Sequence, residues 1–182
     1  MEKLKILILG CSGSGKSTLT RELEQLLKIP ILHLDRIWHT TNYDDEAQKF
    51  LRKTQIDFMT ENESFIVDGN YTSSMDIRMP HANFIIWFRI PRYLCLYRVI
   101  SRSIKQKLKL ETRSDMADEF QEKFDREYIK FLKFIWHFEK NHTPKIEELL
   151  KQRKPNCQVV LVRNKKDKTQ LLKEFKATSS PF

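Results

Sequence analysis

Short apolar runs alternate along the chain with longer segments in which apolar residues recur every three or four positions. The short runs are rich in β-branched residues, as buried strands are, and the longer spacing is that of helices with one buried face. Strands are predicted at 4–9, 31–34, 64–67, 83–88 and 158–162, and helices at 16–27, 44–60, 91–104, 144–151 and 168–176. This alternation predicts an α/β fold built around a parallel sheet.

Two other segments add to this pattern. The segment 120–138 carries aromatic side chains at helical spacing, and we expect them to pack in the core or between helices. From 105 onward the chain turns polar and basic without an apolar stripe, which predicts a lid at approximately 105–118. Pro91 and Pro144 are each expected to open a helix, because proline is tolerated in the first turn. No repeat or linker is evident, so one domain spanning 1–182 is predicted.

One motif carries a specific chemistry. The run Gly10-Cys-Ser-Gly-Ser-Gly-Lys-Ser17 matches G-x-x-x-x-G-K-[ST] in full, with an apolar strand before it and an amphipathic helix after it. Glycines let the backbone curl until successive N–H groups point at an anion, and the following helix adds its dipole. Lys16 is expected to reach the β- and γ-phosphates of ATP, and the Ser17 hydroxyl to bind Mg²⁺. The predicted ATP-binding set in this region is Gly10, Ser12, Gly13, Ser14, Gly15, Lys16, Ser17 and Thr18.

Carboxylates follow two of the predicted strands. Asp68 precedes Gly69 at the end of an apolar run, so it would lie at the ligand-binding edge of a parallel sheet and could hold Mg²⁺ directly or through water. An Asp-Gly pair is also a common turn, which is the alternative interpretation. Asp35 could position or deprotonate an acceptor hydroxyl, and Arg36 could pair with a substrate anion. The neighbouring His33 is expected to be structural.

Arginines are the remaining candidates, because phosphoryl transfer depends on positioning and charge neutralisation. Arg78 follows the carboxylate of Asp68 in the chain and could reach the acceptor site. Arg98 and Arg102 lie one helical turn apart and would share a face of their helix. Each arginine taken alone could be an ordinary surface residue, and only the set favours a catalytic role.

Composition narrows the class of partner. The 33 basic and 24 acidic residues give a net charge of +9, which favours an anion: either a small phosphate-bearing substrate or nucleic acid. The apolar runs fall far short of the roughly 18–20 residues that cross a bilayer, so no membrane span is expected. No signal peptide is evident, and we expect a cytoplasmic protein. The three cysteines lack a metal-binding spacing, and no disulfide is expected.

Together these motifs resemble those of nucleoside monophosphate kinases such as adenylate kinase. They are still more similar to the bacterial topology modulation proteins, an adenylate-kinase-related family, and the similarity extends from Lys3 to about Val162. The segments that carry it are Gly10-Cys-Ser-Gly-Ser-Gly-Lys-Ser17, Leu32-His-Leu-Asp-Arg36, Ile66-Val-Asp-Gly-Asn-Tyr71, Pro91-Arg-Tyr-Leu-Cys-Leu-Tyr-Arg98 and Arg113-Ser-Asp-Met116.

The resemblance implies a P-loop NTPase three-layer sandwich, with a parallel sheet of strand order 2-3-1-4-5 between helices and a lid over the phosphates. It also implies that Arg98 and Arg102 stabilise the transferring phosphoryl group and that Arg163 lies near the purine ring. One motif departs from the family pattern: adenylate kinases have Asp-Gly-Phe-Pro-Arg where this chain has the run from Asp68 to Thr72. The residues expected on the acceptor side are Asp35, Arg36, Asp68, Gly69 and Arg78.

Two functions follow as alternatives. The first is a kinase that moves the γ-phosphoryl of ATP, bound with Mg²⁺, to a nucleotide or another small hydroxyl- or phosphate-bearing acceptor. Its expected catalytic residues are Lys16, Asp35, Arg98 and Arg102. The second is an ATP-dependent regulator associated with nucleic acid, motivated by the net charge and by the name of the resembling family. No helix-turn-helix, RRM or zinc-finger pattern supports this second function. The sequence names neither the acceptor nor the oligomeric state.

Overall fold

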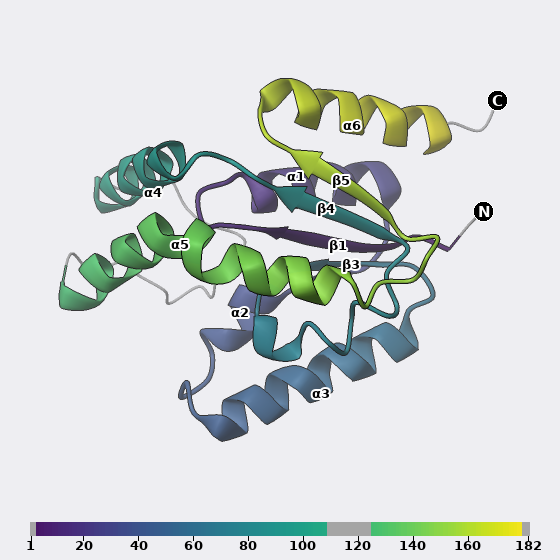
Figure 1. The fold of residues 1–182 in the computed structure, drawn as a ribbon, viewed down its shortest axis with the longest axis horizontal. Helices are drawn as coiled ribbons and strands as arrows, with labels where there is room; N and C mark the ends of the chain where they lie inside the picture. Colours follow the sequence, from purple (N-terminus) through teal and green to yellow (C-terminus); the bar gives the residue numbers. More distant parts are fainter. Residues whose placement is uncertain (1–2, 109–124, 180–182) are drawn as a thin grey trace.

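The computed structural model describes residues 3–108 and 125–179. Its strands are β1 Lys5–Gly10, β2 Ile31–His33, β3 Phe65–Asp68, β4 Phe84–Phe88 and β5 Gln158–Val162. They form one five-stranded sheet in the order β2-β3-β1-β4-β5, and every neighbouring pair is parallel (Figure 1). The predictions of an α/β fold and of this strand order are confirmed.

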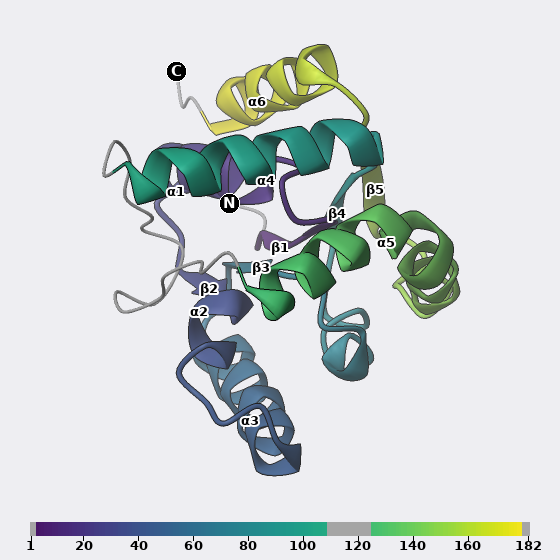
Figure 2. The same cartoon turned by 90° about the vertical axis from the view of Figure 1, so that its left-hand side faces the viewer.

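Helices cover both faces of the sheet. They are α1 Lys16–Leu27, α2 Leu34–Trp38, α3 Asp45–Glu61, α4 Arg92–Lys107, α5 Arg126–Leu150 and α6 Lys165–Ser179, and Thr72–Ser74 forms a 3₁₀ turn. α1 and α6 lie on one face, and α3 and α5 lie on the other (Figures 1 and 2). Within β1, Ile6 and Ile8 pack toward α1 and α6, whereas Leu7 and Leu9 pack toward α3 and α5. Burial on both faces explains why the strands are almost continuously apolar.

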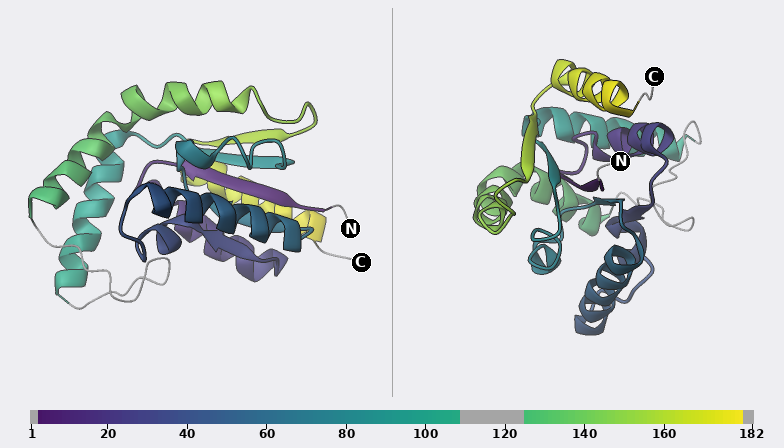
Figure 3. Two further views of the ribbon diagram at one scale, coloured as in Figure 1. Left: turned by 90° about the horizontal axis from the view of Figure 1, so that it is seen from below. Right: turned by 90° about the vertical axis from the view of Figure 1, so that its right-hand side faces the viewer.

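The carboxyl ends of the strands lie at one edge of the sheet. The loop from β1 to α1, the short α2 and the start of α4 gather there, and α4 and α5 project beyond the sheet on that side (Figures 1 and 3). α4 packs against α5. Ligands of parallel α/β sheets bind outside the carboxyl ends of the strands, so this edge is where a site is expected.

α5 corrects one expectation from the sequence. Pro144 does not open a helix of its own but lies inside α5, which continues beyond it. Proline removes a main-chain hydrogen bond and crowds the preceding turn, which bends helices. The ribbon of α5 changes direction between its two halves (Figure 3). Burial on both sides of the proline holds the helix on the core, because Ile135 before it and Ile146 after it are fully buried.

The segment between α4 and α5 bears on two other expectations. Most of the predicted lid at 105–118 lies outside the described residues, but residues 105–107 belong to α4, which ends at Lys107 rather than at 104. The described part of the aromatic segment is helical, as its spacing predicts. Only some of its rings are core: Tyr128 and Phe138 are buried, whereas two rings are exposed, those of Phe134 and Trp136.

A helix that crosses a membrane must be both long and apolar, and no helix in the described parts of the chain is long and apolar enough.

Candidate nucleotide-binding site

The loop from Gly10 to Ser17 joins β1 to α1 at the carboxyl edge of the sheet. At Gly13 the backbone is left-handed, with φ of +77°, and a Cβ atom there would lie 2.4 Å from the main-chain oxygen of Cys95. Only glycine satisfies both the backbone conformation and this contact. The loop therefore packs directly against α4. Among the other predicted ATP-binding residues, Ser12 and Ser17 are half-buried and Thr18, in α1, is exposed.

Lys16 begins α1 and is almost fully buried, with 8% of its surface exposed. Its ammonium group donates a hydrogen bond to the main-chain oxygen of Cys11 at 3.2 Å, so the side chain turns back over the loop. The main-chain N–H of Ser14 donates to the same oxygen at 3.1 Å. The Ser14 hydroxyl is buried and has no hydrogen-bond partner among the described residues. A buried hydroxyl of this kind is rare in native proteins, and a phosphate oxygen in the loop would supply its partner.

Asn70 holds the first residue of the loop. Its Nδ2 donates to the main-chain oxygen of Gly10 at 2.6 Å, and its Oδ1 accepts from the main-chain N–H of Gly10 at 2.8 Å. No role for Asn70 is predicted from the sequence, where it belongs to a segment similar to the topology modulation proteins and departs from the adenylate kinase pattern. The order of the strands contains the missing signal: β3 neighbours β1, so the residues after β3 lie beside the residues after β1. Asn70 thus ties the end of β3 to the phosphate loop.

Asp68 ends β3 next to β1, the strand that leads into the loop. It is 5% exposed, and its Oδ2 lies 3.3 Å from Nδ1 of His33, with which it pairs across β2 and β3. Its Oδ1 is buried without a hydrogen-bond partner among the described residues. A buried carboxylate oxygen with a vacant bonding position suits a hard cation such as Mg²⁺. Among the described residues, no group of three or more His, Cys, Asp or Glu side chains could hold a metal ion by itself.

Asp35 lies in α2, which the sequence does not predict. α2 sits close to the end of β3 because Gly69, at φ of +139°, has no side chain: a Cβ there would lie 2.9 Å from the Cβ of Leu34. The hydroxyl of Tyr71 donates to Oδ1 of Asp35 at 2.9 Å. Burial and the charge of Asp35 raise the pKa of Tyr71, so the phenol keeps its proton and remains a donor. This hydrogen bond fixes one oxygen of Asp35. The carboxylate is half-buried and lies at the edge of the sheet where the strands end.

Tyr71 belongs to a group of aromatic rings. The ring of Trp38 lies with its centroid 5.7 Å from that of Tyr71 and 5.7 Å from that of Tyr43. Tyr43 is 54% exposed. Trp38 and Tyr43 therefore extend an aromatic group that begins with Tyr71, the residue that holds Asp35.

The two acceptor-side arginines lie in different surroundings. Arg78 is fully buried, and its guanidinium donates to Oε1 of Gln55 at 2.9 Å and to the main-chain oxygens of Gly69 and Asn70. Burial lowers its pKa to about 9, which leaves it protonated at neutral pH. Through these contacts the guanidinium of Arg78 binds the turn that carries Asn70, and it does not extend into an open cleft. Arg36 is exposed on α2.

The helical arginines lie on α4 beside the loop. Nη1 of Arg98 donates to the main-chain oxygens of Gly13 at 3.4 Å and Ser14 at 3.2 Å. Arg98 thus binds the carbonyl groups of the loop. The N–H groups point to the opposite side and stay available to an anion. Arg102 is half-buried one turn further along α4. Arg163 is exposed just after β5, and its main-chain N–H donates to Asp167 at 2.7 Å.

Cys11, the cysteine of the phosphate loop, is buried and its thiol is unreactive. The three cysteines are free, and all are buried. Hydrogen bonding to Cys95 and burial raise the pKa of Cys11, so its thiol stays protonated at neutral pH. Cys11 therefore acts as a packing residue between the loop and its neighbours.

No protein-family model matches the sequence, and neither does any curated protein. Solved structures share the fold. The gluconokinase from Sinorhizobium meliloti matches with a TM-score of 0.54 at 13% identity, over 96% of this chain and 90% of that chain. The shikimate kinase from Acinetobacter baumannii, in complex with shikimate, matches with a TM-score of 0.52 at 15% identity, over 95% and 91%.

The shikimate kinase from Bacteroides thetaiotaomicron has a TM-score of 0.50 at 13% identity, over 96% of this chain and 97% of that chain. Identities this low establish the fold alone. The chain therefore has the α/β fold, with strand order 2-3-1-4-5, that these P-loop kinases share. The resemblance to the topology modulation proteins stays a prediction from the motifs.

Proposed function

We propose that this protein is a P-loop phosphotransferase that moves the γ-phosphoryl of ATP to a small acceptor. The observation that carries the proposal is the buried Asp68 at the end of β3, with an oxygen that lacks a partner among the described residues, beside the strand that enters a complete phosphate loop. A phosphate loop alone suits many NTPases. A carboxylate at this position, with a second carboxylate at Asp35 after β2, adds the parts needed for metal binding and for an acceptor.

The loop residues bind and orient the donor. The N–H groups at the start of α1 and the ammonium of Lys16 neutralise phosphate oxygens, since the ammonium has three donors and gives only one of them to the oxygen of Cys11. Ser17 and Asp68 are the residues that would hold Mg²⁺, whose chemistry is to neutralise charge on the β- and γ-phosphates. Arg98 and Arg102 extend this positive surface along α4.

Asp35 is the residue that meets the acceptor. Its carboxylate accepts the proton of an acceptor hydroxyl, or holds that hydroxyl in line, while Tyr71 fixes its orientation through the 2.9 Å hydrogen bond. The neighbouring structures are named as kinases of gluconate and shikimate, which favours a small acceptor. Exposed Arg36, on the same short helix, would pair with an anionic group of that acceptor.

The test is a screen of purified protein with Mg·ATP against nucleoside monophosphates and small hydroxy acids, with ADP release as the readout. Wild type is expected to form ADP faster when the right acceptor is present. Lys16→Ala and Asp35→Asn should each lose at least about 100-fold in this stimulated rate, as for removal of a key charge or base. Asp57→Asn, an exposed carboxylate of α3, is the matched control and should keep the wild-type rate.

Two results would contradict the proposed phosphotransferase activity. One is the absence of any acceptor-stimulated ADP formation across the screen, with Lys16→Ala indistinguishable from wild type. The other is stimulation that persists unchanged in Asp35→Asn, which would place the acceptor elsewhere.

A further inference from the structure

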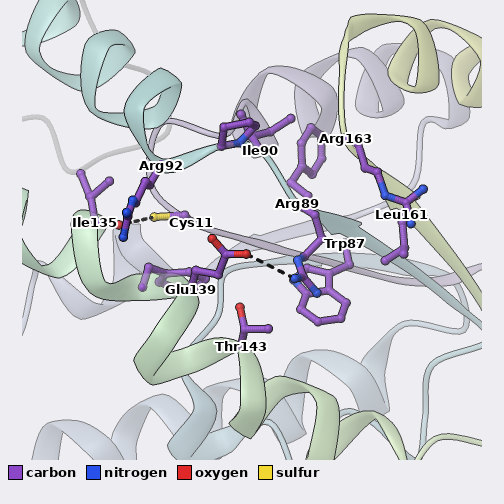
Figure 4. Close-up of a pocket in the computed structure, with 13 residues that line it drawn as sticks. Cys11, Trp87, Arg89, Ile90, Arg92, Ile135, Glu139, Thr143, Leu161 and Arg163 are labelled. Carbon is purple, nitrogen blue, oxygen red and sulfur yellow. Dashed lines mark hydrogen bonds and ion pairs between the residues drawn. The ribbon is translucent and has the colours of Figure 1, made fainter.

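A cavity of about 390 Å³ opens on the α5 side of the sheet, and Cys11 of the phosphate loop is one of its lining residues (Figure 4). It lies between the carboxyl ends of β4 and β5, the start of α4 and the middle of α5. Its volume falls within the range of roughly 300–1,000 Å³ typical of small-molecule sites. None of the proposed donor and acceptor residues Lys16, Ser17, Asp35 and Asp68 lines it. The cavity is thus separate from the residues proposed for phosphoryl transfer.

The walls of the cavity combine apolar surface with excess positive charge. Its apolar lining includes Ile90, Ile135, Phe138 and Leu161. Its charged lining is Arg89, Arg92, Arg163 and Glu139. Small-molecule sites likewise combine apolar surface, which takes the body of the ligand, with polar groups that orient it.

The ion pairs around the cavity do not cancel its charge. Arg89 lies 3.6 Å from Glu139 and 3.2 Å from Glu147, and the dashed line in Figure 4 marks the first of these pairs. The guanidinium of Arg92 lies over the ring of Trp136, 4.0 Å from its centroid, a contact that leaves its charge in place. The side chain of Arg163 has no hydrogen bond or ion pair with any described residue. Two carboxylates therefore face three guanidinium groups.

Trp87 supplies a second, independent indication. It lines the cavity, is only 3% exposed, and its Nε1 has no hydrogen-bond partner among the described residues. An indole N–H can only donate, so the partner that it lacks is an acceptor. Buried donors without acceptors are rare in native proteins. An oxygen of a bound carboxylate, sulfonate or phosphate would satisfy it.

We propose that this cavity is a second ligand site, which binds a small organic anion with an apolar or aromatic body. The apolar lining takes the body, and the charge of Arg92 and Arg163 selects the anion. The site also touches the phosphate loop, because Cys11 lines the cavity. The inference does not rest on the proposed kinase activity, since no residue with a role in that proposal lines the cavity. Arg163, which the resemblance to adenylate kinase places near the purine ring, is the one lining residue with an expected link to ATP, and competition with Mg·ADP tests that link.

The probe is 8-anilinonaphthalene-1-sulfonate, an aromatic anion that fluoresces in apolar surroundings. Wild type is expected to bind one molecule saturably, and saturating Mg·ADP should leave it bound. Arg92→Glu reverses a charge at the cavity and should weaken binding about tenfold or more. An acidic residue suits the first turn of α4, so this variant is expected to fold. Lys173→Glu, an exposed residue of α6 with the same charge change, is the matched control and should bind like wild type.

A second variant fills the cavity without changing charge. Thr143→Phe adds a ring at a position that is 7% exposed and lines the cavity, and it should weaken probe binding to the same degree. If this variant fails to fold, Arg92→Glu still decides the matter. Three outcomes would overturn the proposal: no saturable binding to wild type, full displacement of the probe by Mg·ADP, or equal affinity in Arg92→Glu and Lys173→Glu.

Discussion

Replacing Asn70 with alanine would remove both hydrogen bonds that hold Gly10, at 2.8 Å and 2.6 Å. Each such bond contributes about 1 kcal/mol net, and a buried partner left unpaired costs about 1–3 kcal/mol. Because Asn70 is half-buried, water can reach part of the vacated space and offset some of this loss. We therefore expect the free energy of unfolding to fall by about 2 kcal/mol.

The same change should weaken nucleotide binding. A loop that relaxes in the free protein must be restored when phosphate binds, at a cost of up to the same ~2 kcal/mol, which corresponds to about 30-fold in affinity. Asn70→Asp should be worse than Asn70→Ala for Mg·ADP. It retains an acceptor for the N–H of Gly10, but it sets a carboxylate oxygen against the oxygen of Gly10 and adds negative charge beside a phosphate site.

Urea titration would measure stability, and isothermal titration calorimetry with Mg·ADP would measure affinity. Asn62→Ala is the matched control, because Asn62 also donates its amide to a main-chain oxygen, that of Phe58 at 2.8 Å, but lies at the end of α3. It should lose some stability and keep wild-type affinity for ADP. Wild-type affinity in both Asn70 variants would refute the role given to this residue. An affinity loss in Asn62→Ala equal to that in Asn70→Ala would show that general destabilisation is the cause.

Three other substitutions test separate features. Arg78→Met leaves the main-chain oxygens of Gly69 and Asn70 without their buried donor, so we expect urea midpoints to report a loss of about 3 kcal/mol or more in unfolding free energy. Gly13→Ala drives a Cβ atom toward the main-chain oxygen of Cys95, so the loop must shift, and calorimetry should detect no Mg·ADP binding while circular dichroism stays native. Burial lowers the pKa of His142, so the unfolded chain binds its proton more readily, and the free energy of unfolding should fall as the pH drops below about 6.5. His142→Phe should reduce that slope between pH 7.5 and pH 5.5 in urea titrations.

Each of these expectations has an opposite result. Unchanged urea midpoints for Arg78→Met would contradict the buried network around its guanidinium. Normal ADP affinity in Gly13→Ala would contradict the packing of the loop on α4. An NMR titration that places the pKa of His142 above 6.5 would contradict the sign of its pH dependence.

The fold could be predicted because each of its strands is marked locally. Five apolar runs separated by amphipathic segments indicate a parallel sheet, and burial of both faces of β1 keeps its run unbroken. α2 could not be predicted in the same way, since five residues are too few to display a helical period. The helix expected to start at Pro144 failed for a different reason: burial of α5 on both sides of the proline outweighs the local tendency to break.

The candidate site was only partly predictable. The phosphate loop is one continuous motif, and Asp68 follows an obvious strand, so both are visible in the sequence. Asn70 acts on a main-chain group that lies far away along the chain, and no spacing rule points to it. Arg78 is predicted from the sequence as an acceptor-site residue, but its contacts with the turn at Gly69 and Asn70 depend on burial that the sequence does not reveal. Arg98 was identified from its helix, but its contact with the carbonyl groups of the loop depends on how α4 packs against Gly13.

The hydrogen bonds that Asn70 and Arg98 make to the phosphate loop have a consequence for the order of folding. Asn70 is 60 residues from Gly10 along the chain, and Arg98 is 84 residues from Ser14. Closing such long loops carries an entropic cost that is repaid only when distant segments meet, which slows folding. The eight-residue motif thus cannot acquire its shape when it first leaves the ribosome, since β3 and α4 must be synthesised and docked before the loop is held. Nucleotide affinity in this protein is therefore expected to report that β3 and α4 have docked beside β1.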